Sequence, residues 1–326
     1  MICCRYGGWN RLKRVVITGS CCVLLFGSML VLAAGWFIGD YFVDFSLQRG
    51  TAENPKALPL ACQSILEANM QLPAQPAADS EIWQVTAEDG LGLVGTCFRR
   101  AGNGHRWVIL VHGYGRIQQN TWDYAEKYLA HGYAVLTPDL RASGDSEGRY
   151  LTMGAKESRD LQQWVARILQ EDPDARIVLH GISMGAATVM MASALPMPDN
   201  VAAVVEDCGY TSAYAMFTIQ LERLFHLPER PLMDCVDFMS REKTGTALSE
   251  AAPLLAVPHT KVPMLFIHGD DDRLVPYEMM QQLYDASNAP VKESMTVSGA
   301  GHASAKAADP VRYFQRLFAF TDAYTK

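Results

Sequence analysis

Residues His180–Ala187 read "HGISMGAA" and place one serine between two glycines, each two positions away. The run before it, "ARIVLH" (175–180), has the β-branched character of a buried strand, and "MGAATVMMASAL" after it predicts a helix. Ser183 therefore occupies a strand-to-helix turn. So tight a turn strains the serine backbone. It also leaves no room for side chains at Gly181 or Gly185, which would collide with the neighbouring strand or helix.

Two interpretations of Ser183 follow from this position. A serine that begins a helix can be a simple helix cap. The GxSxG spacing instead predicts a nucleophile whose hydroxyl projects over the sheet. The free N–H groups and the positive dipole end of the helix would then face a developing oxyanion. Because GxSxG also occurs by chance, the second interpretation requires catalytic partners elsewhere in the chain.

Length and composition limit the class of protein. The chain has 326 residues, of which 49% are hydrophobic and 19% charged, enough for one large globular domain. A net charge of −7, with no basic stripe interleaved with aromatic residues, argues against nucleic-acid binding. The eight cysteines form neither a disulfide framework nor a pair with zinc-ligand spacing.

The N-terminal region differs in composition from the rest. No charged residue occurs between Arg14 and Asp40, and the apolar run is long enough to cross a bilayer. We predict a transmembrane helix over residues 15–39. Basic residues in 1–14 and acidic residues after the span predict a cytoplasmic N-terminus and a single-pass protein of the cell membrane whose remainder is extracytoplasmic. Four aromatic residues suit the far membrane interface: Trp36, Phe37, Tyr41 and Phe42.

A cleaved signal peptide is the alternative interpretation of this region. The apolar core is longer than a usual signal-peptide core, and no small-x-small cleavage site follows it. The Pro- and Ala-rich stretch that comes next, within residues 40–80, predicts a linker or N-terminal arm.

Residues 81–326 alternate between strand-like and helix-like segments. This alternation predicts an α/β domain with a mostly parallel sheet and helices on both faces. Two late strands are separated by about fifty residues, far more than an ordinary connection, so we expect a small helical cap over about 210–260. Apolar residues near helical spacing in this cap either cover the site or pack the cap onto the sheet: Tyr214, Phe217, Leu221, Leu224 and Phe225.

A serine nucleophile needs a base, an orienting acid and oxyanion donors. The loop "HGYG" (112–115) can direct the backbone N–H of Tyr114 at a developing charge, and Met184 supplies a second N–H. "DDDRLVP" places carboxylates after a late strand, and "GAGHAS" places His302 before the last helix. The candidate groups thus follow the order Ser, Asp, His.

In combination, these motifs resemble the α/β-hydrolase superfamily, and more narrowly bacterial membrane-anchored serine hydrolases of the serine-aminopeptidase-like or monoglyceride-lipase-like branch. The resemblance covers Glu81–Phe320 and rests on "HGYG", "PDLRASGDSEG", "GISMGA", "IHGDDDRLVP" and "GAGH" in order. It implies Ser183 as nucleophile, Asp272 as acid and His302 as base. "RAS" stands where many relatives have "RGH", at a position without a catalytic role.

Several residues have a competing interpretation. Asp207 ends another strand and is the alternative acid. Each of three further histidines at strand ends precedes a glycine and is expected to hydrogen-bond loop backbone: His112, His180 and His268.

The expected activity is hydrolysis of a small-molecule acyl ester through an acyl-enzyme, with no metal or organic cofactor required. Peptidase, amidase or acyltransferase activity on the same triad is the alternative, and a non-catalytic membrane-tethered binding protein is a third hypothesis. The sequence does not specify an oligomeric state.

Overall fold

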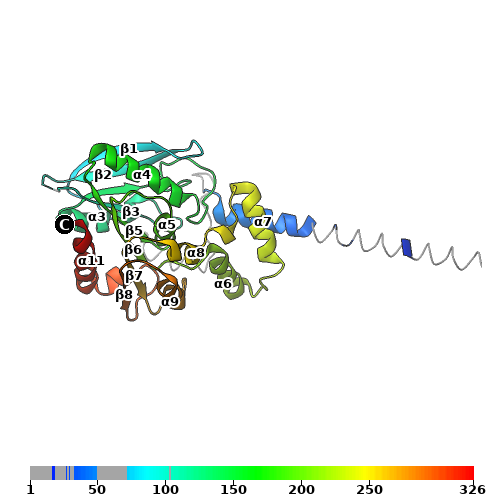
Figure 1. The fold of residues 1–326 in the computed structure, drawn as a ribbon. Coiled ribbons are helices and arrows are strands. Elements are labelled where there is room, and N and C mark those ends of the chain that lie inside the picture. Colours follow the sequence, from blue (N-terminus) through cyan, green and yellow to red (C-terminus); the bar gives the residue numbers. More distant parts are fainter. Residues whose placement is uncertain (1–16, 19–26, 28, 30–32, 50–71, 103) are drawn as a thin grey trace, which may run out of the picture.

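The computed structural model describes residues 17–18, 27, 29, 33–49, 72–102 and 104–326. These residues form one eight-stranded sheet in the order β1-β2-β4-β3-β5-β6-β7-β8 (Figure 1). The first two pairings, β1 with β2 and β2 with β4, are antiparallel, and all others are parallel, which confirms the mostly parallel sheet. The strands are β1 Asp79–Thr86, β2 Gly92–Arg99, β3 Arg106–Val111, β4 Ala134–Pro138, β5 Arg176–Ile182, β6 Val201–Asp207, β7 Met264–Gly269 and β8 Lys292–Val297.

Helices cover both faces of this sheet, as the sequence predicts. One face packs against α3 (Trp122–Ala130) and α11 (Pro310–Thr325), and the other against α4 (Glu157–Glu171), α5 (Met184–Ala192) and α9 (Tyr277–Ala286). Side chains of β3 alternate between these two cores, because successive residues of a strand point to opposite faces. The apolar run of β3 therefore identifies a strand buried on both sides.

The predicted cap insert is helical and comes between β6 and β7 in the sequence. Its helices α6 (Ala213–Phe225) and α7 (Leu232–Thr244) lie to one side of the sheet (Figure 1). Ser212 begins the first of these helices, where the Ser212 hydroxyl accepts a hydrogen bond from the Ala215 backbone N–H at 3.1 Å. Gly245 ends the second helix in the left-handed region, with φ 75°. The cap also contains α8 Pro253–Ala256. Shorter helical segments are Gln118–Thr121, Leu248–Glu250, Val257–His259 and α10 Ala305–Ala308.

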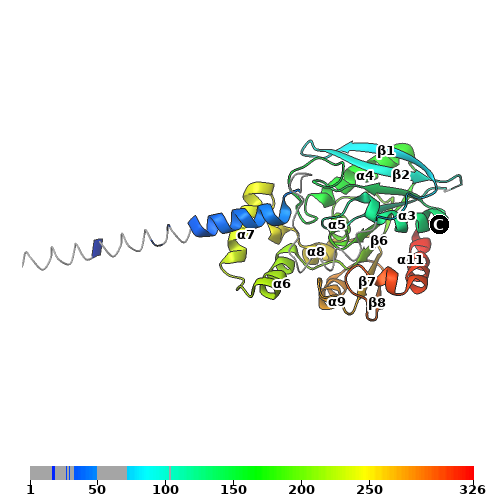
Figure 2. The same cartoon turned by 180° about the vertical axis from the view of Figure 1, so that it is seen from behind.

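Residues 33–47 form a helix, here called the N-terminal helix, that lies beside α7 of the cap (Figure 2). Its residues Val43 and Leu47 are buried. At its last residue, the Leu47 carbonyl accepts the Leu151 backbone N–H at 2.9 Å, which ties the helix to the core domain. The first residues of the stretch predicted as a linker or N-terminal arm, 40–80, are therefore helical and packed against the domain.

Among the described residues, no helix is both long enough and apolar enough to cross a bilayer. Most of the predicted span, 15–39, and most of the arm that follows it lie outside the described residues. The membrane segment thus stays a prediction.

Candidate active site

Ser183 lies at the turn between β5 and α5. Its φ of 57° and ψ of −116° are a backbone conformation that residues other than glycine rarely adopt. A Cβ on Gly181 would lie 2.1 Å from the carbonyl oxygen of Gly185, and a Cβ on Gly185 would lie 2.1 Å from that of Val111. Both positions therefore exclude any side chain. The strained turn that the GxSxG spacing predicts is confirmed.

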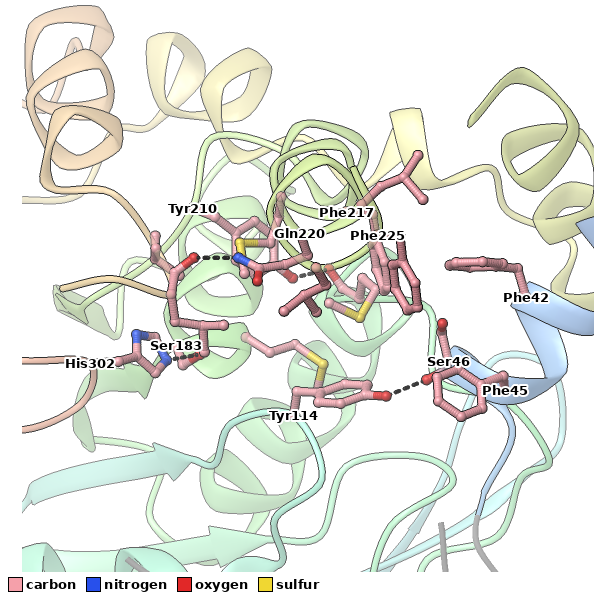
Figure 3. Close-up of a pocket in the computed structure, with 17 residues that line it drawn as sticks. Phe42, Phe45, Ser46, Tyr114, Ser183, Tyr210, Phe217, Gln220, Phe225 and His302 are labelled. Atoms are coloured by element: carbon pink, nitrogen blue, oxygen red, sulfur yellow. Dashed lines mark hydrogen bonds between the residues drawn. The ribbon is translucent and has the colours of Figure 1, made fainter. Parts of the chain in front are cut away.

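Three predicted site residues come together through hydrogen bonds. His302 Nε2 lies 2.8 Å from Ser183 Oγ (Figure 3). On the other side of the ring, His302 Nδ1 lies 2.7 Å from Asp272 Oδ2. With the proton on Nδ1, the imidazole donates to the carboxylate and accepts the serine hydroxyl proton at Nε2. Asp272 comes from the loop after β7 and His302 from the loop after β8, so the parallel strands bring the two loops to one edge of the sheet.

Asp272 is held in its ionised form. Its Oδ1 accepts the backbone N–H groups of Leu274 and Val275, both at 2.9 Å. Burial raises the pKa of Asp272, but hydrogen bonds from His268 and His302 outweigh it and hold the pKa well below its usual range. A carboxylate in this state can fix the His302 tautomer and stabilise an imidazolium.

Asp207, the alternative acid, has a different partner. It is buried at the end of β6, and its Oδ2 accepts the hydroxyl of Tyr313 at 2.7 Å. Burial raises the pKa of Asp207, although the Tyr313 hydrogen bond opposes this change. Since His302 pairs with Asp272, the geometry favours Asp272 as the orienting acid.

The loop after β3 reaches Ser183 closely. A Cβ on Gly113 would lie 3.3 Å from Ser183 Cβ, so a glycine lets the loop approach the hydroxyl-bearing side chain. The next residue, Tyr114, and the first residue of α5, Met184, both line the same cavity as Ser183. Their backbone N–H groups remain the predicted oxyanion donors.

A cavity of about 120 Å³ adjoins Ser183 and His302, and most of the side chains around it are apolar (Figure 3). Its walls come from the core domain, from α6 and from the N-terminal helix. The lining residues are Phe42, Phe45, Ser46, Tyr114, Met153, Ser183, Met184, Tyr210, Met216, Phe217, Gln220, Leu221, Leu224, Phe225, Leu274, Val275 and His302.

Most of the apolar stripe predicted in the cap does face this cavity. The exception is Tyr214, whose hydroxyl donates to Glu229 at 3.0 Å. Sequence reasoning missed Phe45 and Ser46, and it assigned Phe42 to a membrane interface although Phe42 lines the cavity. Their spacing on one helical face, at positions 42, 45 and 46, is the signal that could have identified them.

Two of the other strand-end histidines, His112 and His180, have structural roles. His112 Nδ1 donates to the Gly113 carbonyl and its Nε2 accepts the Leu140 backbone N–H, which confirms the expected backbone role. The prediction for His180 is wrong in its partners, since this ring lies between the hydroxyls of Tyr128 and Tyr313. Burial lowers the pKa of His180 to about 3, so the ring is neutral.

His268 differs again, because its ring touches the candidate acid. Its Nε2 lies 3.0 Å from the Val275 carbonyl and 3.3 Å from Asp272 Oδ2. The expected backbone contact is confirmed, and the second contact makes His268 part of the surroundings of Asp272.

In the described part of the chain, one group of side chains has the spacing of metal ligands, with candidate ligand atoms of Cys208, Asp272 and His302 within 4.8 Å of one another. Two of the three already bond to each other. His302 also contacts Ser183 through its other ring nitrogen, so both ring nitrogens already have hydrogen-bond partners within the protein.

Residues 108–315 match the sequence model of the Alpha/beta hydrolase family. The match covers more than half of the chain and contains Ser183, Asp272 and His302. The chain belongs to the alpha/beta hydrolase family.

Known relatives of this alpha/beta hydrolase include the uncharacterised protein YqkD of Bacillus subtilis, 29% identical over 185 residues, or 56% of this chain. The alignment spans 60% of YqkD, less than two thirds of that protein.

Solved structures of an esterase and of a peptidase share the fold. The esterase Pf2001 of Pyrococcus furiosus has a TM-score of 0.63 and 24% identity, with 78% of this chain and 99% of that chain covered. An acylaminoacyl peptidase of Pyrococcus horikoshii has a TM-score of 0.55 and 17% identity, with 80% and 42% covered. At these identities the similarity concerns the fold alone.

Proposed function

We propose that this alpha/beta hydrolase is a serine esterase that acts through an acyl-enzyme on Ser183. The observation that carries the proposal is the continuous hydrogen-bond chain from Ser183 Oγ through His302 to Asp272. His302 Nε2 takes the hydroxyl proton as Ser183 Oγ attacks the substrate carbonyl, and Asp272 stabilises the resulting imidazolium.

Each half of the reaction passes through a tetrahedral intermediate. The backbone N–H groups of Tyr114 and Met184 would hold its oxyanion, and one such donor is worth about 2.7 to 4 kcal/mol. When the intermediate collapses, the bond to the leaving alcohol breaks and His302 returns the proton to that oxygen. Water then loses a proton to His302 as its oxygen attacks the acyl-enzyme carbonyl. When this second intermediate collapses, the bond to Ser183 Oγ breaks, His302 returns the proton to Oγ and the acid leaves.

The apolar cavity favours an ester with a short to medium acyl chain over a peptide. Each buried methylene contributes about 0.8 kcal/mol, whereas each peptide N–H or C=O left without a partner costs about 1 to 3 kcal/mol. The amide of Gln220, a polar group of the lining, already donates to the Leu274 carbonyl at 3.0 Å. Amide cleavage is the second candidate, because an acylaminoacyl peptidase shares the fold.

A p-nitrophenyl ester series from acetate to laurate, assayed beside aminoacyl-anilides, tests the substrate class. We expect kcat/KM to rise by up to about fourfold per methylene until the cavity is full. The Ser183→Ala variant measures the background rate. A flat ester profile with faster anilide cleavage would reject the ester proposal in favour of a peptidase.

We also propose that residues 15–39 anchor the enzyme in the cell membrane, with 1–14 in the cytoplasm and the hydrolase domain outside it. The charge difference across the apolar run supports this orientation. Alkaline phosphatase fused after Lys326 should therefore be active. Activity only from a reporter that works in the cytoplasm would reverse the orientation.

A further inference from the structure

We infer that the N-terminal helix is a working part of the substrate site: it limits the length of the acyl chain and holds the loop that carries Tyr114. This inference rests on the proposed function, since acyl length matters only if Ser183 is acylated. It gives residues 33–47, which include the end of the predicted membrane span and the residues directly after it, a role in substrate selection.

Close backbone packing fixes this helix against the cap. A Cβ on Gly39 would lie 2.7 Å from Met239 Cγ and 2.8 Å from the Cys235 carbonyl oxygen of α7. One turn earlier, a Cβ on Gly35 would lie 2.8 Å from the Cys235 sulfur. Glycine at both positions lets the two helices touch backbone to side chain.

Polar contacts fix the same helix both to α7 and to the core domain. The ammonium of Lys243, on α7, lies 2.6 Å from Asp40 Oδ1 and 2.7 Å from Asp44 Oδ1. The hydroxyl of Tyr150, from the core domain, donates to Asp44 Oδ1 at 2.7 Å. Burial raises the pKa of Asp44, but the hydrogen bonds from Lys243 and Tyr150 lower it overall, so Asp44 stays charged.

One face of the fixed helix forms part of the cavity wall. Phe42 and Phe45 line it, and the Phe42 ring meets the Phe225 ring of α6 edge to face at a centroid distance of 6.1 Å. In Figure 3 these phenylalanines lie at the far end of the cavity from Ser183 and His302. A short acyl group bound to Ser183 would not reach them, whereas the end of a longer chain would.

The helix also contacts the loop beside the nucleophile. The hydroxyl of Tyr114 donates to the Ser46 carbonyl at 2.5 Å (Figure 3). Tyr114 directly follows Gly113, the residue that packs against Ser183. Through its side chain Tyr114 is thus a positioning residue, because a shift of the helix would move the loop that supplies the proposed oxyanion donor.

Acyl-chain profiles of the full chain in detergent test the inference with the p-nitrophenyl series. In Phe45→Ala the space freed at the far end should raise the laurate-to-butyrate ratio of kcat/KM about tenfold, and Phe45→Trp should lower it. Phe37→Ala is the matched control, since Phe37 lies on the same helix, is 74% exposed and does not line the cavity. If Phe45→Ala and Phe45→Trp both gave the same acyl-chain profile as the wild type, the role of the helix in chain selection would be overturned.

Tyr114→Phe tests the positioning role with acetate ester, whose acyl group is too short to reach Phe45. We expect kcat to fall about tenfold with little change in KM. Unchanged kcat would overturn this part. Ser183→Ala separates the two proposals: acetate turnover that survives it would refute the serine mechanism, whereas Ser183-dependent turnover with unchanged profiles would refute only the role of the helix.

Discussion

Replacing Ser183 or His302 with alanine is expected to reduce ester turnover by about 10⁴-fold or more. Ser183 supplies the attacking oxygen, and His302 Nε2, 2.8 Å away, is the base that accepts its proton. The fold should persist, because both side chains lie on turns at the edge of the sheet rather than in its core. Steady-state kinetics and thermal unfolding of each variant check both expectations.

The two residues act as one unit, so the double variant should be little worse than either single variant. Losses that multiply would contradict the coupled triad. A fluorophosphonate probe adds a readout that does not depend on the substrate, since it should label Ser183 in the wild type and leave Ser183→Ala unlabelled. Absence of labelling in the folded wild-type protein would favour the non-catalytic binding protein.

Local patterns were sufficient to predict the sheet and the nucleophile turn. A strand buried on both faces needs a continuous apolar run, and β3 and β5 both have one. The turn at Ser183 is encoded by two glycines, because the close backbone approaches at Gly181 and Gly185 admit no other residue. Both signals lie within a few residues of the feature that they predict.

The N-terminal helix escaped prediction because its partners are distant in sequence. Phe42 follows a long apolar run, where an aromatic residue fits a membrane interface as well as a protein interior. Its contact with Phe225 joins segments about 180 residues apart, and no local pattern reports such a pairing. The same holds for His180, whose tyrosine partners come from α3 and α11.

The acid was ambiguous from position alone. Asp207 ends β6 and Asp272 follows β7, and these neighbouring parallel strands end at the same edge of the sheet. A carboxylate at either position could in principle reach His302. The family resemblance favours Asp272, and the side-chain hydrogen bonds agree with it.

Asp272→Asn should therefore reduce turnover by about 10³- to 10⁴-fold, whereas Asp207→Asn should change it by less than about tenfold. The backbone N–H groups of Leu274 and Val275 both donate to Oδ1, so the asparagine oxygen must occupy that position. Its NH₂ group then faces His302 Nδ1, which becomes an acceptor. Nε2 consequently carries the proton and can no longer take one from Ser183.

Two neighbouring carboxylates provide matched controls for Asp272→Asn. Asp270 accepts the backbone N–H of Gly299 at 2.6 Å, and Asp271 lies 3.3 Å from the Arg273 guanidinium at the surface. Since neither reaches His302, Asp270→Asn and Asp271→Asn should retain nearly wild-type kcat. Near-normal turnover in Asp272→Asn together with collapse in Asp207→Asn would transfer the orienting role to β6, because the imidazole would then have to leave Asp272 during catalysis.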